Sequence, residues 1–336
     1  MSVRTDYMRG TFAAWTVPLK HRRGLTYVAT FFCGYLTHAF TLHSTLRPLQ
    51  STLSPQSTNR NDFDDARANA GTFTGQQPKC PHYDRELDRQ DLQTLLDSKK
   101  PWFHEILFEN GAKTDAYDVT IDKQRTNMHG LPDSFVGKTV LDVGTFNGAW
   151  AQEAVRRGAK HVTSVDYFVW VQNNFHDFYN FCFARAQNGM EDKISYKLLP
   201  IEDLAPSEFD DKFDVVFFFG IMYHAEDPIG YLRRIRSVLK PGGMAIVETV
   251  VDMLDVPYPA SAIYDGEYAL NGDDTNDFGP NELGVIAMMK KAGFSRAEVT
   301  QRNFVNFNQH IMLDKAKNQR NWTNEVGGRS TFIGYA

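Results

Sequence analysis

The stretch VLDVGTFNG, from Val140 to Gly148, constrains this chain most, because an apolar segment runs directly into a turn with two glycines. The residues that follow, AWAQEAVRR, predict a helix whose first backbone amides face that turn. Glycine lets a ligand approach the backbone where a side chain would intervene. A second apolar segment, HVTSV, ends in Asp166, where a carboxylate can accept both ribose hydroxyls of an adenosine-type cofactor. These features predict a nucleotide site.

The glycine spacing separates two cofactor classes. Folds that bind NAD favour the pattern G-x-G-x-x-G, which places a pyrophosphate at the helix end. This turn reads G-T-F-N-G instead, with Phe146 where the middle glycine would stand. A nicotinamide dinucleotide is therefore the weaker interpretation.

Further motifs follow in order, namely FDVVFFFGIMYHAEDP, LKPGG, MAIVETVVD, TNDFGPN and KKAGF. With them, the chain from about Pro101 onward resembles class I S-adenosylmethionine-dependent methyltransferases. It is most similar to the tRNA wobble-uridine carboxymethyltransferase family and the relatives of that family. The resemblance implies S-adenosyl-L-methionine as the cofactor and a methyltransferase domain over residues 131–336.

Strands and helices alternate from Thr139 onward, which predicts an α/β protein with a doubly wound, mostly parallel sheet. The expected parallel strands are 139–143, 161–166, 194–199, 215–220 and 244–251. The resemblance adds an antiparallel hairpin of residues 297–304 and 330–335, which completes a Rossmann-like sheet of seven strands.

Ligands of such a sheet bind beyond the C-terminal strand ends. The resemblance implies that Asp142 and the backbone from Gly144 to Gly148 hold the methionine end of the cofactor. It also implies that Asp166 holds the ribose and that the turn Ile201–Asp203 flanks the adenine. An ordinary loop acid is an equally good interpretation of Glu202. The expected cofactor residues are Asp142, Gly144, Phe146, Gly148, Asp166, Ile201, Glu202, Gly220 and Arg329.

Three residues are the catalytic candidates. His224 follows the fourth strand, and histidine takes up protons near neutral pH, so it is the best candidate for a base or an acceptor-orienting group. Tyr223 could orient the acceptor or face the sulfonium. His104, with Trp102, lies where the family closes its site from the N-terminal side. Two residues of the same lid are Asn276 and Asn281, although helix capping alone explains Asn281.

One difference between this chain and that family affects which form of the cofactor we expect. The resemblance implies that a lysine, a tyrosine and an arginine clasp the extra carboxylate of carboxylated S-adenosylmethionine in the wobble-uridine family. Tyr223 and Arg329 match, but His104 occupies the lysine position. This loss of a charged contact favours ordinary S-adenosylmethionine.

The leading hypothesis is a methyltransferase that acts on an O, N or S atom of a small-molecule acceptor. The alternatives are tRNA wobble-uridine modification and a non-catalytic cofactor-binding scaffold. The net charge of −5 provides no overall field that would attract a polyanion, so nucleic acid is not the favoured partner.

The N-terminal region has a separate organisation. Residues 25–46 contain no Asp, Glu, Lys or Arg and are long enough to cross a bilayer, so they predict a membrane anchor or a cleaved targeting segment, with a buried helix as a third alternative. Residues 1–24 would then be a cytosolic or targeting N-terminus, because Lys20, Arg22 and Arg23 precede the apolar segment. A disordered linker is expected at 47–84 and a helical lid at 85–130. The chain is accordingly expected to be membrane-anchored or organelle-targeted.

The cysteines Cys33, Cys80 and Cys182 are too few and too scattered for a metal site, and no metal is expected. Isolated thiols are the favoured interpretation. A bridge between Cys80 and Cys182 is the alternative, in an oxidising lumen.

Two helices after the glycine turn carry specific expectations. The aromatic segment FVWVQNNFHDFYNFCF predicts one helix with aromatic residues on more than one face. Asp227 and Pro228 predict the cap and first turn of the helix IGYLRRIRSVL. Asn281 and Gly293 bracket ELGVIAMMKKA in the same way.

Overall fold

The structure is a computed structural model that describes residues 77–83, 87–116, 130–264, 275–303 and 328–336. All of these fall in the unit Ser57–Ala336. The segments expected at 1–24 and 25–46 lie outside the described residues. Within the described ranges, no helix is both long and apolar enough to cross a bilayer.

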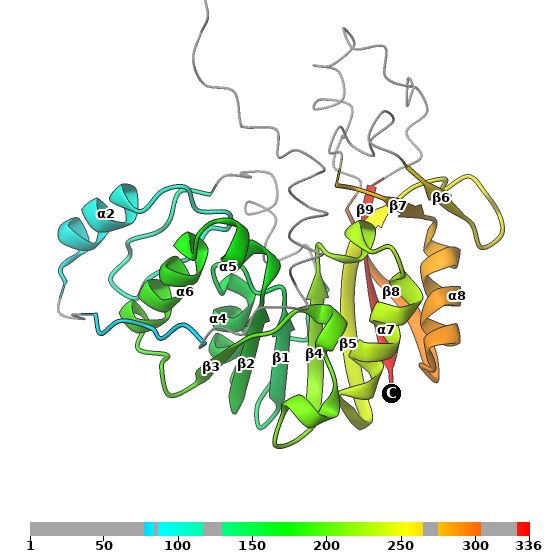
Figure 1. The fold of residues 1–336 in the computed structure, drawn as a ribbon, viewed down its shortest axis with the longest axis horizontal. Helices are drawn as coiled ribbons and strands as arrows, with labels where there is room; N and C mark the ends of the chain where they lie inside the picture. The colour runs from blue at the N-terminus through cyan, green and yellow to red at the C-terminus, as the bar shows by residue number, and fades with distance from the viewer. Residues whose placement is uncertain (1–76, 84–86, 117–129, 265–274, 304–327) are drawn as a thin grey trace, which may run out of the picture. The chain divides into compact units, whose positions relative to one another are not determined.

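The centre of this unit is a seven-stranded sheet in the order β3-β2-β1-β4-β5-β9-β8 (Figure 1). Neighbouring strands are parallel from β3 to β5, whereas β9 is antiparallel to both β5 and β8. The strands are β1 (Thr139–Val143), β2 (His161–Asp166), β3 (Ile194–Leu198), β4 (Phe213–Phe219), β5 (Leu239–Val251), β8 (Arg296–Asn303) and β9 (Gly328–Tyr335). The predicted Rossmann-like α/β fold with its C-terminal antiparallel hairpin is confirmed.

The strand bounds agree with the predicted ones to within two residues, except at the start of β5. This strand begins at Leu239 rather than Met244, because Leu239 pairs with Phe213 before the register shifts and Met244 pairs with Val215. Residues 241–243, the Pro-Gly-Gly part of the LKPGG motif, are therefore an irregularity within β5. A short hairpin of β6 (Ser261–Ile263) and β7 (Phe278–Pro280) lies outside the main sheet.

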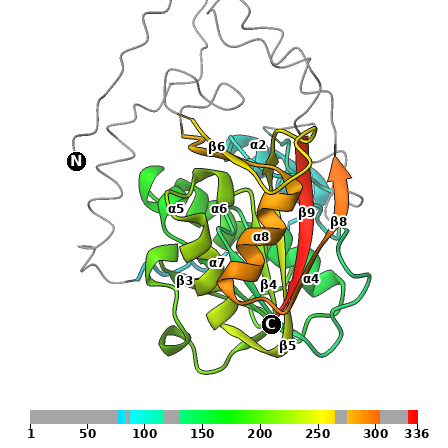
Figure 2. The same cartoon turned by 90° about the vertical axis from the view of Figure 1, so that its right-hand side faces the viewer.

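Helices cover both faces of the sheet, and the alternation of apolar residues along the strands explains this. Leu141 and Val143 belong to a core with α7 (Pro228–Ser237) and α8 (Glu282–Ala292), while Val140 faces α4 (Ala149–Arg156). Figure 2 shows α8 beside β9 and β8. The buried strands thus anchor two layers of helices.

Both predicted caps are present. The Asp227 side chain accepts a hydrogen bond from the Gly230 amide at 2.8 Å, and Pro228 occupies the first turn of α7. Asn281 accepts from the Gly284 amide at 2.7 Å, and Gly293 ends α8 with φ of 101°.

The aromatic helix predicted after Asp166 is wrong as one helix. It is divided into α5 (Phe168–Gln172) and α6 (His176–Gln187), because Asn174 and Phe175 have φ of 49° and 63°. A left-handed backbone interrupts helical hydrogen bonding and turns the chain. Most aromatic side chains on these helices are buried, namely Trp170, Phe178, Phe181 and Phe183.

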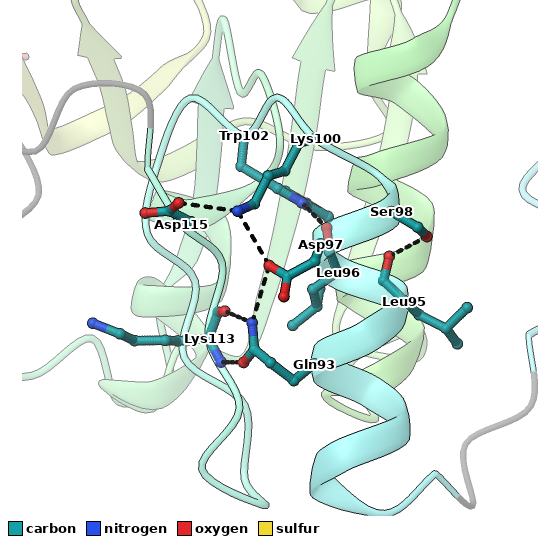
Figure 3. A network of polar contacts seen from close by, with 9 residues as sticks. All are labelled: Gln93, Leu95, Leu96, Asp97, Ser98, Lys100, Trp102, Lys113 and Asp115. Atoms are coloured by element: carbon teal, nitrogen blue, oxygen red, sulfur yellow. Dashed lines mark hydrogen bonds and ion pairs between the residues drawn. The ribbon is translucent and has the colours of Figure 1, made fainter.

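The N-terminal described segment packs on α6 through α2 (Arg89–Ser98) and the loop that follows it. Leu92 and Leu96 are buried with Phe183 in a common core. Figure 3 shows how the loop is held: the Trp102 indole donates to the Leu96 carbonyl at 2.9 Å, and Lys100 reaches both Asp97 and Asp115, at 3.2 and 3.0 Å.

A disulfide joins Cys80 to Cys182 of α6, with Cα atoms 5.4 Å apart. The favoured interpretation of isolated thiols is wrong for this pair. The Tyr196 hydroxyl accepts from the Cys80 amide at 2.9 Å and donates to the Pro78 carbonyl at 3.2 Å. Residues 77–83, at the end of the predicted linker, therefore belong to the folded unit.

Candidate functional site

The turn between β1 and α4 has the backbone that its glycines predict. Gly144, Phe146 and Gly148 have φ of 70°, 53° and 80°. A Cβ on Gly144 would lie 2.3 Å from Cδ1 of Ile221, and one on Gly148 would lie 2.6 Å from Phe181. Both positions therefore require glycine for conformation and for space.

Asp142 is the penultimate residue of β1, close to this turn, and is buried. Its Oδ2 accepts from the Thr145 hydroxyl at 2.7 Å. Burial raises the pKa of Asp142 to about 6, although hydrogen bonds from Thr145 and the Ala151 backbone oppose the increase. The carboxyl group lies at the N-terminal end of α4, where partial positive charge stabilises an anion.

Asp166 ends β2, the adjacent strand, and is 5% exposed. One of its carboxylate oxygens accepts from the Phe146 amide at 2.9 Å and the other from the Val169 amide at 3.3 Å. Burial raises its pKa to about 7 against these two hydrogen bonds, and the negative charges of Asp177 and Asp142 add to the increase. Asp166 thus connects the glycine turn to α5.

Phe146 is held in place by its backbone carbonyl and by its ring. Its carbonyl accepts from the Trp170 indole at 2.9 Å, and its ring stacks on Phe103 with centroids 4.6 Å apart. The His104 ring lies 6.1 Å from Phe146 and 6.2 Å from Trp150. The Phe103 and His104 rings therefore lie against the turn.

Trp102 differs from its neighbours in this segment. It is fully buried in a core that it shares with Leu92 and Leu96 of α2 and with Ala149, which directly follows the glycine turn. The Phe103 amide instead donates to Asn147 at 3.1 Å, and Asn147 donates to Asp177 at 2.8 Å. Neither Phe103 nor Asn147 was predicted as a site residue, because each hydrogen-bonds to a residue distant in the sequence.

On the other side of the turn, β4, β5 and β9 bring a buried ion pair to the same edge. Arg329 donates through Nε and Nη2 to the two carboxylate oxygens of Glu248, with the Nη2 distance at 2.9 Å. Burial alone would lower the pKa of Arg329, but the attraction of Glu248 outweighs it and raises the pKa. Arg329 also lies 3.4 Å from the Tyr223 hydroxyl.

Gly220 explains how these groups approach the end of β4. Its amide donates to Oε2 of Glu248 at 3.1 Å, and a Cβ there would lie 3.6 Å from the Tyr223 hydroxyl and 3.7 Å from Arg329. The structure therefore brings Gly220, Tyr223 and Arg329 together, as predicted. Glu248, which completes the cluster, was not predicted, although the ETVVD motif contains it.

His224 lies in η3 (Met222–His224), directly after β4. Its Nδ1 is 2.9 Å from the Thr275 carbonyl oxygen and 3.1 Å from Oγ1 of Thr275. The His224 and Tyr223 rings have centroids 4.2 Å apart. Thr275 is a further residue that the sequence did not indicate.

The predicted adenine turn is η1 (Ile201–Asp203), which follows β3. Ile201 is half-buried against the core, whereas Glu202 is exposed and accepts a hydrogen bond from the Tyr231 hydroxyl. η1 is positioned at the site edge because the Leu199 amide donates to the Asp166 carbonyl at 3.1 Å.

The two predicted lid asparagines differ. Asn276 is 5% exposed, close to η3 through its neighbour Asp277, whose amide donates to the Tyr223 carbonyl at 3.0 Å. Asn281 caps α8, and its side-chain amide also donates to the Val256 and Tyr258 carbonyls, so its polar atoms serve the fold.

The site therefore extends along one edge of the sheet, from Asp166 through the glycine turn to Tyr223 and Arg329. Two contacts connect the part of the site near Asp166 to the part near Arg329. Gly144 packs against Ile221, and the ring centroids of Trp150 and Phe219 lie 5.5 Å apart. Among the residues that the structure describes, no group of three or more His, Cys, Asp or Glu side chains could hold a metal ion.

Known proteins are similar to this chain, some in sequence and some in fold. Two tRNA U34 carboxymethyltransferases are similar: that of Campylobacter curvus (strain 525.92) is 30% identical over 199 residues, 57% of each chain. That of Shewanella pealeana is 31% identical over 165 residues, 49% of this chain and 47% of the relative. The chain thus spans about half the length of these relatives.

Among solved structures, the N-terminal domain of EvdMO1 with SAH bound has a TM-score of 0.52 at 15% identity, covering 76% of this chain and all of that one. This likeness establishes the fold alone. The sequence matches the methyltransferase domain family over residues 121–313, more than half of its length. The chain therefore belongs to the methyltransferase domain family.

Proposed function

We propose that the chain is an S-adenosyl-L-methionine-dependent methyltransferase that methylates an O, N or S atom of a small-molecule acceptor. One observation carries the proposal: two buried carboxylates, Asp142 and Asp166, lie at the C-terminal ends of adjacent strands, beside a glycine turn with left-handed backbone. The family match supports the same reaction class.

The described residues fit this cofactor. Each carboxylate oxygen of Asp166 accepts one backbone amide, so a further lone pair on each can accept a ribose hydroxyl. The backbone of the glycine turn would hold the methionine end, near Asp142, and η1 would flank the adenine. When bound, S-adenosyl-L-methionine supplies an electrophilic methyl group on a sulfonium.

The acceptor would be held on the other side of the turn. Phe103, Phe146 and Tyr223 are half-buried aromatic residues at this edge, which suits an apolar or planar acceptor. His224 is our candidate for the base, Tyr223 for an orienting group, and His104 for a residue that closes the site over Phe146.

Plain rather than carboxylated cofactor is proposed, because Arg329 is already neutralised. Glu248 uses both Nε and Nη2 of the guanidinium, so the pair has no net charge to attract a second carboxylate. Arg329 would then position Tyr223 rather than bind the cofactor directly.

Modification of a tRNA wobble uridine is the second candidate, and the names of the relatives favour it. The two candidates predict different behaviour. A tRNA substrate would bind in a salt-sensitive manner, because phosphate contacts release counterions, whereas a small acceptor would not.

The test is incubation of the purified full chain with methyl-labelled S-adenosyl-L-methionine and a cell extract, followed by identification of the labelled product. We expect label in small molecules with the wild type and loss of label with Asp166→Asn. Label in tRNA alone would favour the second candidate. Cofactor binding without label in any fraction would favour the non-catalytic scaffold.

We further propose that this unit folds in an oxidising compartment, anchored or targeted by residues 25–46. The Cys80–Cys182 disulfide supports this, since disulfides persist mainly in such compartments. The sequence Asn321-Trp322-Thr323 would then be a glycosylation acceptor. A mass decrease on glycosidase treatment of the native protein is expected, and an unmodified Asn321 would argue against a lumenal domain.

A further inference from the structure

Residues 275–277 hold η3 in place through hydrogen bonds to Tyr223 and His224. The Asp277 amide donates to the Tyr223 carbonyl at 3.0 Å, and the Asp277 carbonyl accepts from the Tyr264 amide at 2.9 Å. These backbone bonds fix Thr275 next to His224, where both its carbonyl oxygen and Oγ1 approach Nδ1. The contact is therefore built by two elements, η3 and the residues before β7.

The chemistry of this contact determines where the imidazole proton lies. A carbonyl oxygen can only accept a hydrogen bond, so Nδ1 of His224 must be the donor at 2.9 Å. In the neutral ring, a proton on Nδ1 leaves the lone pair on Nε2. A histidine side chain in water prefers the opposite arrangement, with its proton on Nε2, so Thr275 imposes the less common tautomer.

We propose that Thr275 is a positioning residue that makes Nε2 of His224 the proton-accepting atom of the site. This inference rests on the proposed methyl transfer and narrows the acceptor to an oxygen, nitrogen or sulfur atom that carries a proton. That acceptor atom forms the bond to the methyl carbon, and its proton passes to Nε2 of His224. The electron pair of the broken carbon–sulfur bond stays on sulfur, so neither an oxidant nor a reductant is required.

The first test reads the tautomer directly in the full chain labelled with ¹⁵N-histidine. Two-bond ¹H–¹⁵N correlation spectra distinguish a protonated ring nitrogen from one with a lone pair, and His224→Gln identifies the signal. We expect a protonated Nδ1 and an unprotonated Nε2 once the ring is neutral. A neutral ring with its proton on Nε2 would overturn the inference.

The second test separates the Thr275 hydroxyl from the fold around it. Thr275→Val replaces the hydroxyl by a methyl group of similar size, and Thr275→Ser retains it. We expect Thr275→Val to lower kcat about fivefold, the effect of one lost neutral hydrogen bond, and to displace the His224 nitrogen shifts. Serine should restore both. Wild-type kcat and wild-type shifts in Thr275→Val would contradict a role of the hydroxyl and would leave the positioning to the Thr275 carbonyl, which the first test examines.

The third test concerns the base itself. His224→Gln should lower kcat on the order of 10²-fold while the Kd for S-adenosylhomocysteine stays unchanged. The matched control is His161→Gln, since His161 is half-buried on β2 beside Ser195, at 2.9 Å, away from the site edge. Unchanged kcat in His224→Gln would overturn the inference.

Failure of the inference can be distinguished from failure of the proposed function. A wild-type chain that neither binds S-adenosylhomocysteine nor transfers methyl groups contradicts the function, whatever the spectrum shows. Wild-type turnover together with an Nε2-protonated ring contradicts only the role of Thr275.

Discussion

Asp166 shows how a single side chain can serve both the fold and the ligand. Its two oxygens accept the Phe146 and Val169 amides, which ties the glycine turn to the start of α5. Burial keeps its pKa at about 7, well above the 3.8 of an exposed carboxyl group. Near neutral pH, the unliganded protein therefore contains this carboxyl group in both protonation states.

Cofactor binding should consequently depend on pH. Only the ionised Asp166 accepts both ribose hydroxyls, so the affinity for S-adenosylhomocysteine should increase as the pH rises through about 7. Calorimetric titrations over this range should show weaker binding in Asp166→Asn, with a smaller dependence on pH. The exposed residue Asp210 provides the control, since Asp210→Asn should bind as the wild type does. An Asp166→Asn variant with the wild-type pH dependence would contradict this role.

The same shift has the opposite effect on the stability of the unliganded protein. Because the folded pKa is raised, the folded state binds one more proton than the unfolded state between pH 3.8 and about 7. The contribution of Asp166 to the free energy of unfolding is therefore greatest at low pH and is lost as the pH rises through about 7. The denaturant midpoint of the wild type should therefore fall relative to that of Asp166→Asn as the pH rises through about 7.

Gly144 allows a second prediction at the residue scale. Gly144 and Gly137 have similar φ angles of 70° and 75°, but a Cβ on Gly137 would meet no atom within 4 Å. Gly137→Ala should therefore cost about 1 kcal/mol from backbone strain alone and leave cofactor binding unchanged. Gly144→Ala should destabilise more and weaken binding, because the new methyl group displaces Ile221. Equal behaviour of the two variants would mean that the contact with Ile221 is unimportant.

The sequence predicted the placement of residues that lie at the end of a strand or directly after one. Asp142, Asp166 and Gly220 lie at the sheet edge because strand ends fix their positions. Glu248 and Thr275 could not be found in this way. Their importance arises from contacts with Arg329 and His224, which are 81 and 51 residues away in the sequence.

At the scale of elements, α6 connects the N-terminal segment to the site. Cys182 is bonded to Cys80, Asn180 donates to the Lys99 carbonyl at 3.1 Å, and Asp177 accepts from Asn147 of the glycine turn. The break before α6 was missed because its aromatic residues match a helical period, although Asn173 and Asn174 are common turn residues. The disulfide was not the favoured interpretation, since the sequence does not give the separation of two cysteines.

The disulfide should contribute substantially to stability. It closes a loop with a sequence separation of 102 residues, which restricts the unfolded chain, so Cys80→Ser should lower the free energy of unfolding by about 2–4 kcal/mol. Urea denaturation with and without a reducing agent measures this difference. Reduction should destabilise the wild type but not Cys80→Ser, and equal denaturation midpoints for all samples would contradict the prediction.

At the scale of the whole molecule, the sequence predicted the sheet well. The strands alternate with helices, and apolar residues on both strand faces indicate a sheet covered twice, as the cores around α7 with α8 and around α4 with α6 confirm. The antiparallel hairpin of β8 and β9 came from family resemblance, and the position of β9 between β5 and β8 was not predicted, because pairing order is not encoded in local periodicity.

The central claim is that the glycine turn and Asp166 bind an adenosyl sulfonium compound at this sheet edge. Isothermal titration calorimetry of the full chain tests it most directly, with S-adenosyl-L-methionine and NAD titrated separately. The account predicts saturable binding of one S-adenosyl-L-methionine per chain and no heat of binding with NAD. Saturable binding of NAD, with none of S-adenosyl-L-methionine, would contradict it.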